Sequence, residues 1–320
     1  MDSVLETIQT GRGGVHPHLR HDQLLQRCKG LRPALTAVVH PCDGPSLTAA
    51  LEATRQGLIT PILVGPEKKI RAIAEANHLD ISSYRLVATP HSHAAAAEAV
   101  RMARVGEVEA LMKGSLHTDE LMHEVVAVQT GLCTDRRISH VYLFDVPEYP
   151  RPLLITDAAI NITPSLSDKR DICQNAIDFA HIIGIDRPKV AVLSAVETVS
   201  AKLPSTVDAA ALSKMAERGQ ITGALVDGPL AFDNAISPQA AQMKEIVSPV
   251  AGQADILLVP DLESGNMLAK QLTFFNGADG AGIVLGARLP IILTSRADPP
   301  RTRLASAALA LLLVTAKRAA

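Results

Sequence analysis

The amino-acid sequence predicts an α/β fold, because short apolar runs alternate along the chain with segments of helical periodicity. Most of these runs are continuously apolar and rich in Val, Ile and Leu, which is typical of parallel strands that are buried on both faces. The runs lie at residues 35–39, 61–65, 109–114, 140–145, 152–157, 189–195, 223–228, 254–261, 281–286 and 290–295.

The segments between the runs have the periodicity of amphipathic helices. Between Ile172 and Ile183, apolar residues recur at spacings of four, three and four, which places them on one face of a helix. Asp168 lies in the first turn predicted for this helix and Gly184 follows its end, as helix termini prefer. The longest apolar run, 304–316, is shorter than the roughly 20 residues that span a bilayer, so we expect a packed terminal helix and no membrane partner.

The composition indicates a globular protein with ample material for a core, since 47% of the 320 residues are hydrophobic and 20% are charged. The formal net charge is −2 and aromatic residues make up 2%, so the chain offers no basic field or stacking platform for nucleic acid. The four cysteines lack metal-ligand spacing and indicate buried, reduced thiols, and the polar N-terminus has no signal-peptide pattern. We therefore expect a cytoplasmic protein without a nucleic-acid partner.

Polar side chains follow several predicted strands at the point where each strand ends. In open α/β sheets, ligands bind beyond the carboxyl ends of strands, at a point where the strand order reverses. After the run 290–295 the chain enters a predicted helix, whose N-terminus adds a positive dipole and free N–H groups. Ser295 and Arg296 therefore lie where an anion would be held.

Six motifs along the chain resemble those of one protein family. They are LMKGSLHT (111–118), RRISHVYLFDVP (136–147), ITDAAINITP (155–164), VDGPLAFDNAIS (226–237), PDLESGNMLAKQL (260–272) and PIILTSRAD (290–298). Their residues and their order resemble the phosphate acetyltransferase and phosphate butyryltransferase family, from about residue 35 to the C-terminus.

The resemblance implies a phosphate acyltransferase that moves an acetyl or other short acyl group reversibly between coenzyme A and inorganic phosphate. Coenzyme A is then a substrate and no cofactor is needed, and the partners are acyl-CoA, inorganic phosphate and acyl phosphate. The resemblance also implies a homodimer whose subunit has two doubly wound α/β domains with a cleft between them, as in isocitrate and isopropylmalate dehydrogenases. The first domain would comprise residues 1–145 with 290–320, and the second residues 146–289.

The segment TSRAD offers the groups that this reaction needs. By the resemblance, Arg296 would bind phosphate, Ser295 would donate to the acyl carbonyl oxygen, and Asp298 would take the proton of the coenzyme A thiol. Asp298 could instead act as the N-cap of the helix that follows, because two prolines come next. The acetyltransferase branch has its aspartate seven positions after the serine, where this chain has Thr302. A substrate-assisted mechanism or a simply oriented thiolate therefore stays open.

The motif LMKGSLHT is a second candidate for phosphate binding. Gly114 lets the backbone approach a ligand closely, and Lys113, Ser115 and Thr118 could contact phosphate. The alternative is an ordinary strand-to-helix turn in which Thr118 is the N-cap.

Four residues further along could complete the site. Arg136 and Arg137 stand in for an arginine that the acetyltransferase branch carries after LMKGSLHT, and arginine binds phosphate through paired hydrogen bonds. A solvated basic turn is the alternative for these two residues. Asp157 and Asn161 would lie in the cleft by the resemblance, or serve turn chemistry alone.

The motif PDLESGNMLAKQL places Asn266 at a helix start and Lys270 one turn further on. Asn266 could donate to phosphate or coenzyme A, whereas Lys270 could equally be a surface residue. No metal site is expected, because the two histidines of HSH (91–93) have no acidic partners at ligand spacing.

Other functions are compatible with parts of the sequence. The same two-domain fold is implied for β-decarboxylating dehydrogenases, but the paired aspartates and nicotinamide site that they need are not found. A phosphate butyryltransferase proper, or a non-catalytic homologue that binds coenzyme A, stays open because of the departures near Ser295 and after LMKGSLHT. The sequence does not define the acyl chain length, since one methylene changes discrimination by only about 1–3 kcal/mol.

Overall fold

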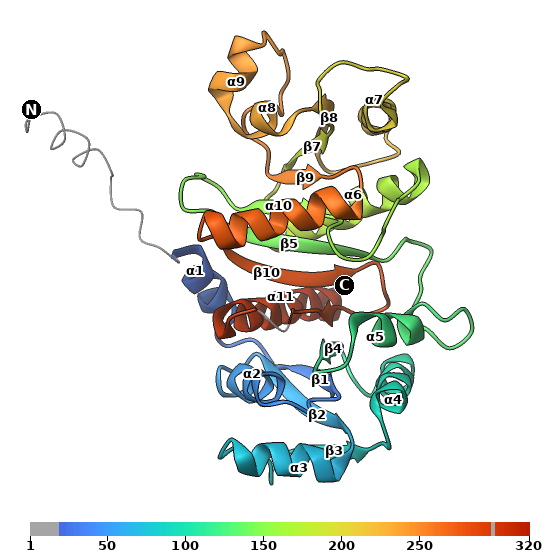
Figure 1. Cartoon of the computed structure of the whole chain (residues 1–320), viewed down its shortest axis with the longest axis vertical. Helices are drawn as coiled ribbons and strands as arrows, with labels where there is room; N and C mark the ends of the chain where they lie inside the picture. The colour runs from blue at the N-terminus through green and yellow to red at the C-terminus, as the bar shows by residue number, and fades with distance from the viewer. Residues whose placement is uncertain (1–18, 296–297) are drawn as a thin grey trace, which may run out of the picture.

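The structure is a computed structural model that describes residues 19–295 and 298–320 (Figure 1). Its helices are α1 (Leu19–Cys28), α2 (Gly44–Arg55), α3 (Glu67–Ala76), α4 (Ser92–Arg104), α5 (Thr118–Val125), α6 (Leu166–Ile182), α7 (Pro204–Glu217), α8 (Phe232–Ile236), α9 (Pro238–Met243), α10 (Leu262–Phe275) and α11 (Pro300–Ala319). Its strands are β1 (Ala34–Val39), β2 (Ile59–Gly65), β3 (Arg85–Ala88), β4 (Ala110–Lys113), β5 (Ser139–Asp145), β6 (Leu153–Thr156), β7 (Lys189–Leu193), β8 (Leu225–Leu230), β9 (Ile256–Leu258), β10 (Asp279–Leu285) and β11 (Ile291–Ile292).

These elements confirm the predicted α/β fold. All strands belong to one sheet with the order β3-β2-β1-β4-β11-β10-β5-β6-β9-β7-β8, which runs along the length of the molecule in Figure 1. Each apolar run forms a strand, and the run 304–316 lies within the predicted terminal helix, α11. The sequence did not predict β3, because this edge strand has no fully buried residue and therefore no continuous apolar pattern. The division into residues 1–145 with 290–320 and residues 146–289 stays a prediction.

The sheet has two parallel flanks and an antiparallel centre. The first flank is β3-β2-β1-β4-β11 and the second is β6-β9-β7-β8, with parallel pairing throughout each flank. Between them, β10 and β5 form the central pair, and each runs antiparallel to both of its neighbours. The prediction of parallel strands is therefore wrong for the centre. The short connections from β10 to β11 and from β5 to β6 explain the difference, since only antiparallel neighbours can be joined by a few residues.

The two parallel flanks of the sheet run in opposite directions. Because three successive antiparallel pairings separate β11 from β6, the two flanks point in opposite directions. The carboxyl ends of the strands in one flank therefore lie on the side of the sheet where the strands of the other flank begin.

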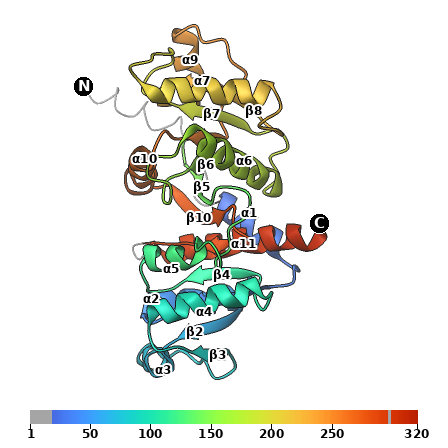
Figure 2. The ribbon, with the colours of Figure 1, turned by 90° about the vertical axis from the view of Figure 1, so that its right-hand side faces the viewer.

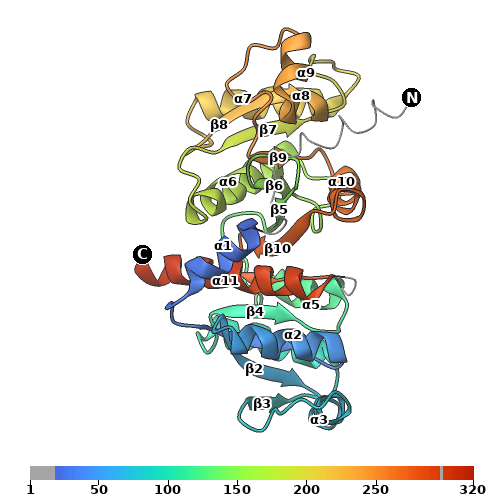
Figure 3. The same ribbon diagram turned by 90° about the vertical axis from the view of Figure 1, so that its left-hand side faces the viewer.

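The two faces of the sheet are covered differently. On one face, residues of α2, α6, α7 and α11 form a single continuous hydrophobic core with the strands. On the other face there are two separate cores, one under α4 and α5 and one beneath α8 and α10. Figures 2 and 3 show α6 and α10 on opposite sides of the second flank. The boundary between the two separate cores falls over the central pair.

Aromatic rings of β5 fill part of that boundary. His140, Tyr142 and Phe144 alternate along the strand and so share a face, with ring centroids 4.4 Å apart for the first pair and 5.4 Å for the second. On β10, Gly280 and Gly282 leave room for them. A Cβ at Gly282 would lie 2.8 Å from the His140 ring, and one at Gly280 would lie 2.9 Å from the Phe144 ring. The two glycines are therefore required by the rings of the neighbouring strand.

The four cysteines are free thiols that differ in burial. Cys28, Cys42 and Cys173 are buried free thiols, as predicted, but the free thiol of Cys133 is exposed. Among the described residues, no helix is long and apolar enough to cross a membrane.

His140 gives the fold a testable dependence on pH. The imidazole is fully buried, and burial lowers its pKa from 6.5 to about 3. Between these values the unfolded chain binds a proton that the folded chain does not. The free energy of unfolding should therefore fall as the pH drops below 6.5, by up to about 1.4 kcal/mol per pH unit from this group.

Urea unfolding of the unaltered protein and of His140→Leu, each followed from neutral to mildly acidic pH, checks this prediction. We expect the loss of stability on acidification to be smaller in the variant, since leucine cannot take up a proton. His123→Leu, at an exposed histidine of α5, is the matched control and should keep the original pH dependence. Equal pH dependence in all three proteins would contradict the prediction.

Candidate functional site

One group of predicted residues lies at the carboxyl ends of β1, β4 and β11. The strand order places β1 beside β4, while the chain leaves β1 toward β2 on the other side. This is a reversal point of the kind where α/β sheets bind ligands. Lys113 ends β4, Ser115 follows it, and Ser295 follows β11.

Gly114 brings the ends of β1 and β4 into close contact. A Cβ at this position would lie 2.4 Å from the Val39 carbonyl oxygen and 2.6 Å from that of His40, so only glycine fits. The Ser115 hydroxyl donates to the His40 carbonyl at 2.9 Å and lies 3.1 Å from the His40 Nδ1. The buried Lys113 ammonium donates to the carbonyls of Gly114 and Leu116. This loop is thus fixed by its own hydrogen bonds.

Thr118 begins α5 and is not its N-cap. The N-cap is His117, whose side chain makes no capping hydrogen bond. The alternative in which Thr118 serves only as a cap is therefore wrong. Thr118 is half-buried, at the first turn of the helix.

Asp298 forms a turn with Ser295 instead of capping α11. Its carboxylate accepts a hydrogen bond from the Ser295 backbone N–H at 2.6 Å, and its own N–H donates to the Ser295 carbonyl at 3.2 Å. The N-cap of α11 is Pro299, and no side chain caps the helix there. The N-cap interpretation of Asp298 is therefore wrong. Arg296, the predicted phosphate ligand, lies outside the described residues.

Arg303 holds this turn from inside α11. The guanidinium is buried and donates to the carbonyls of Asp298, at 3.2 Å, and Ser295, at 3.0 Å. Burial raises the pKa of the Asp298 carboxyl, while the Ser295 N–H and the charges of Arg303 and Lys113 act in the opposite direction. The net result is a carboxyl that is more basic than an ordinary aspartate. Such a group is better matched to proton transfer near neutral pH.

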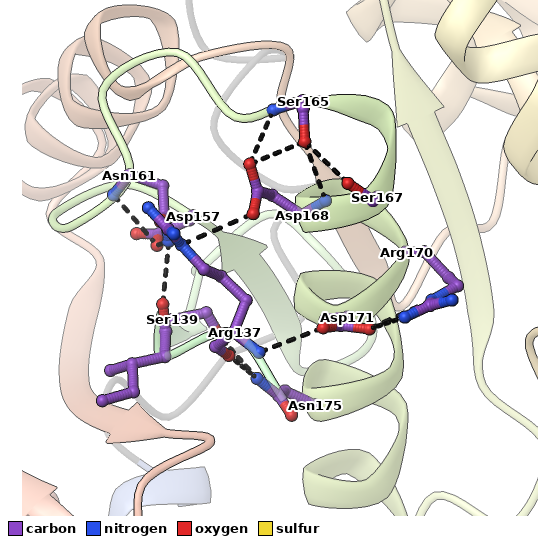
Figure 4. Close-up of polar contacts among 11 residues, drawn as sticks. Arg137, Ser139, Asp157, Asn161, Ser165, Ser167, Asp168, Arg170, Asp171 and Asn175 are labelled. Atoms are coloured by element: carbon purple, nitrogen blue, oxygen red, sulfur yellow. Dashed lines mark hydrogen bonds and ion pairs between the residues drawn. The ribbon is translucent and has the colours of Figure 1, made fainter. Parts of the chain in front are cut away.

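The second group of predicted residues lies in the loop after β6 (Figure 4). The buried Asp157 carboxylate accepts from the N–H groups of Ala159, at 2.9 Å, and Ile160, at 3.1 Å, and from the side chain and backbone N–H of Asn161. Burial raises its pKa despite these bonds. The turn chemistry considered for Asp157 is confirmed, and the carboxylate is occupied by its own loop.

Asn161 links this loop to Arg137 by a hydrogen bond. Its amide N–H₂ donates to the Ile138 carbonyl, and its oxygen accepts from Arg137 Nε at 2.7 Å. Asp168 of α6 lies 3.6 Å from the same Nε. The terminal nitrogens of Arg137 form no hydrogen bond with any described residue, and the side chain is 54% exposed. The Nε of Arg137 is therefore held by Asn161, while the terminal guanidinium nitrogens are available to a ligand.

Arg136 points elsewhere. Its guanidinium pairs with Asp178 of α6, outside the group around Arg137. The two neighbouring arginines are thus not equivalent, since Arg137 contacts Asn161 of the loop after β6 and Arg136 pairs with Asp178.

The start of α10 closes the second group. A Cβ at Gly265 would lie 3.0 Å from the Asp157 carbonyl oxygen, so the helix packs directly on the loop. The Asn266 side chain donates to the Ala158 carbonyl at 3.1 Å. Lys270 is exposed further along α10 and forms no hydrogen bond or ion pair with a described residue. Asn266 therefore belongs to this group by contact, whereas Lys270 forms no polar contact with it.

Tyr142 connects the two groups. Burial raises its pKa to about 12, and the charges of Asp298 and Asp157 act in the same direction. Both carboxylates are therefore close enough to act on one phenol, although they belong to different flanks. The central strand β5 thus lies between the two groups.

The sequence alone did not indicate three of these residues. His40 follows β1 at the reversal point, and its position after an apolar run could have been noticed. Arg303 had a weaker signal, since a cation in the first turn of a helix is unfavourable for the helix dipole and calls for another explanation. Tyr142 had none, because its role depends on which strands lie beside β5. Among residues 19–295 and 298–320, no cluster of three or more His, Cys, Asp or Glu side chains could hold a metal ion.

The fold is that of an α/β protein similar to phosphotransacylases. The crystal structure of a branched-chain phosphotransacylase from Enterococcus faecalis V583 superimposes with a TM-score of 0.76, at 30% identity, over 88% of this chain and 99% of that chain. The model of the phosphate acetyl/butaryl transferase family matches residues 91–311. The chain belongs to this family.

Two curated relatives differ in the acyl group that they are named for. A phosphate acetyltransferase from Rhizobium meliloti is 63% identical over 94% of this chain and 95% of its own length. A phosphate butyryltransferase from Clostridium beijerinckii is 43% identical over 91% of this chain and 97% of its own length.

Proposed function

We propose that this protein catalyses the reversible transfer of an acetyl or other short acyl group between coenzyme A and inorganic phosphate. The observation that carries the proposal is the 63% identity to a phosphate acetyltransferase along nearly the whole of both chains. The lower identity to a phosphate butyryltransferase favours acetyl as the acyl group. Coenzyme A is then a substrate, and the reaction needs no resident cofactor.

The chemistry follows from the groups around Ser295. The thiolate of coenzyme A attacks the carbonyl carbon of the acyl phosphate, a C–S bond forms, and the C–O bond to phosphate breaks. Asp298 accepts the thiol proton, which its raised pKa favours. Arg296 and Lys113 stabilise the departing phosphate, and Ser295 donates to the carbonyl oxygen as negative charge develops there.

The second group serves the anionic parts of the substrates. Arg137 presents free guanidinium N–H groups and is held by Asn161 and Asp168. A guanidinium of this kind binds phosphate or the phosphates of coenzyme A. Asp157 does not contact the substrate in this proposal, but its carboxylate fixes the loop that positions Asn161. Asn266 and Lys270 extend the same surface along α10.

We also propose that the protein is a cytoplasmic homodimer with two α/β domains, divided at residues 145/146 and 289/290. The exposed side chains of Met267, Phe274 and Phe275 on α10 support a partner surface, since large apolar groups on one helix are costly in water. Sedimentation equilibrium would reveal a monomer if the dimer is wrong.

The first prediction from this proposal concerns activity. The purified protein should release free thiol from acetyl-CoA only when phosphate is present, and more slowly from butyryl-CoA. A thiol reagent measures both rates directly. A higher rate with butyryl-CoA would identify a phosphate butyryltransferase instead. Tight binding of coenzyme A without any release would identify a non-catalytic homologue.

The second prediction concerns Asp298. The Asp298→Asn variant should lose about 10²–10⁴-fold in kcat, because asparagine cannot accept the thiol proton. Its oxygen can still accept from the Ser295 N–H, so the melting temperature should change little. In the unaltered protein, kcat should fall as the pH is lowered through the raised pKa of the carboxyl. Full activity of the Asp298→Asn variant would contradict the role of this carboxylate as the base.

The third prediction compares two neighbouring arginines. Arg137→Gln should raise the KM for phosphate or for coenzyme A by roughly 10-fold or more, since hydrogen bonds to charged groups contribute about 1.5–3 kcal/mol. Arg136→Gln removes the same charge one residue away, but its guanidinium is engaged with Asp178. We expect its kinetics to stay within about twofold of the unaltered protein. Equal effects of the two substitutions on KM would contradict the prediction, since they would show that substrate binding depends on the net charge of this region and not on Arg137 itself.

A further inference from the structure

The aromatic row of β5 has no part in the mechanism described so far. His140, Tyr142 and Phe144 share one face of the strand, and the glycines of β10 leave that face uncrowded. His140 and Phe144 are at most 2% exposed. Tyr142 alone is half-buried, and its hydroxyl forms no hydrogen bond with any described residue. The row therefore presents one accessible ring.

The sheet register places this ring midway between the two groups. Tyr142 pairs with Gly282 of β10 on one side and with Ile155 of β6 on the other. Gly282 in turn lies beside Leu293, whose carbonyl oxygen would be 3.2 Å from a Cβ on the glycine. Ser295 is two residues beyond Leu293, and Asp157 is two residues beyond Ile155. The chain runs outward from the level of Tyr142 to both groups.

The surroundings of the ring indicate what could lie against it. The two hydrophobic cores of this face meet over the central pair, and Tyr142 packs at the edge of the core under α8 and α10. Asp157 and Asp298 both act on the phenol with negative charge. A phosphate or another anion is disfavoured in such a place, whereas a neutral apolar chain is not. Two neutral, apolar parts of the proposed reactants lie beside the reacting carbonyl, namely the acyl chain and the methylenes next to the coenzyme A sulfur. Only the acyl chain differs in length between substrates, so it is the part that a side chain at this place can discriminate.

We propose that the ring of Tyr142 forms the floor of the acyl site and limits the length of the acyl group that the protein accepts. This inference rests on the proposed function and adds a specificity-determining residue to it. The ring contacts the acyl chain by its apolar face, so its size matters and its hydroxyl does not. Since one methylene changes discrimination in an apolar pocket by about 10–200-fold, replacing the ring with a smaller side chain should alter chain-length preference measurably.

The test compares kcat/KM for acetyl-CoA and butyryl-CoA, each with phosphate, in the unaltered protein and three variants. Tyr142→Leu should raise the ratio of butyryl-CoA to acetyl-CoA by about 10-fold or more, because it opens space for the longer chain. Tyr142→Phe keeps the ring and should leave the ratio within about twofold. Tyr84→Leu replaces another half-buried tyrosine, near the edge strand β3, and should change neither ratio nor rate. Circular dichroism and melting temperature establish that each variant is folded.

The outcomes distinguish a failure of the proposed function from a failure of the role inferred for Tyr142. If the unaltered protein releases no thiol with either substrate, the proposed function is wrong, and this inference is overturned with it. If the unaltered protein is active but Tyr142→Leu slows both substrates equally, only the inference is overturned. A shift of the ratio in Tyr142→Phe as large as in Tyr142→Leu would also overturn it, since it would assign the effect to the hydroxyl. Should Tyr142→Leu fail to fold, Tyr142→Val and Tyr142→Met carry the same comparison.

Discussion

The antiparallel pairing of β5 with β10 is the constraint on which the rest of the structure depends. Seven residue pairs, from Asp145 with Asp279 to Ser139 with Leu285, join the two flanks of the sheet. The pairing requires glycine at positions 280 and 282, because the rings of Phe144 and His140 occupy the space that a Cβ would need. It also fixes the direction of each flank. Only this central pair lies between β11 and β6, the strands whose carboxyl ends precede Ser295 and Asp157.

Buried residues hold the exposed ones throughout the site. Arg303 fixes the carbonyls of Ser295 and Asp298 from within α11, while Asp157 and Asn161 fix Arg137 from the loop after β6. In each case a buried polar group directs its hydrogen bonds to the backbone or to a neighbour, as buried polar groups must. The side chains left for a ligand are thereby restricted in orientation before any ligand arrives, which lowers the entropic cost of positioning.

The sequence predicted the features that depend on local residue patterns and missed those that depend on contacts between segments distant in the chain. The apolar runs and the terminal helix were visible because burial on both faces requires continuous apolar residues. The half-exposed β3 lacked this signal, and the antiparallel centre depends on which runs pair. Thr118 and Asp298 looked like N-caps from their positions, yet His117 and Pro299 occupy those places. Tyr142 lies between strands that are far apart in the chain, so no local pattern could identify it, and the only local signal for Arg303 was a cation in the first turn of a helix.

Asp298 does not cap α11, so its carboxylate is not committed to the helix and can serve as the proposed base. The chain departs here from the acetyltransferase pattern given by the family resemblance, in which the aspartate stands seven positions after the serine, because Thr302 occupies that position. Thr302 is 9% exposed within the first turn of α11, on a helix whose neighbouring residues form the core. A carboxylate there would need a buried partner, and Arg303 is already engaged with the turn. Asp298 instead stands before the helix, partly exposed, with a Ser295 N–H to orient it and Arg303 and Lys113 to moderate its charge. The proposed base thus lies in the turn that carries the serine, where the Ser295 N–H and the Arg303 guanidinium hold both residues.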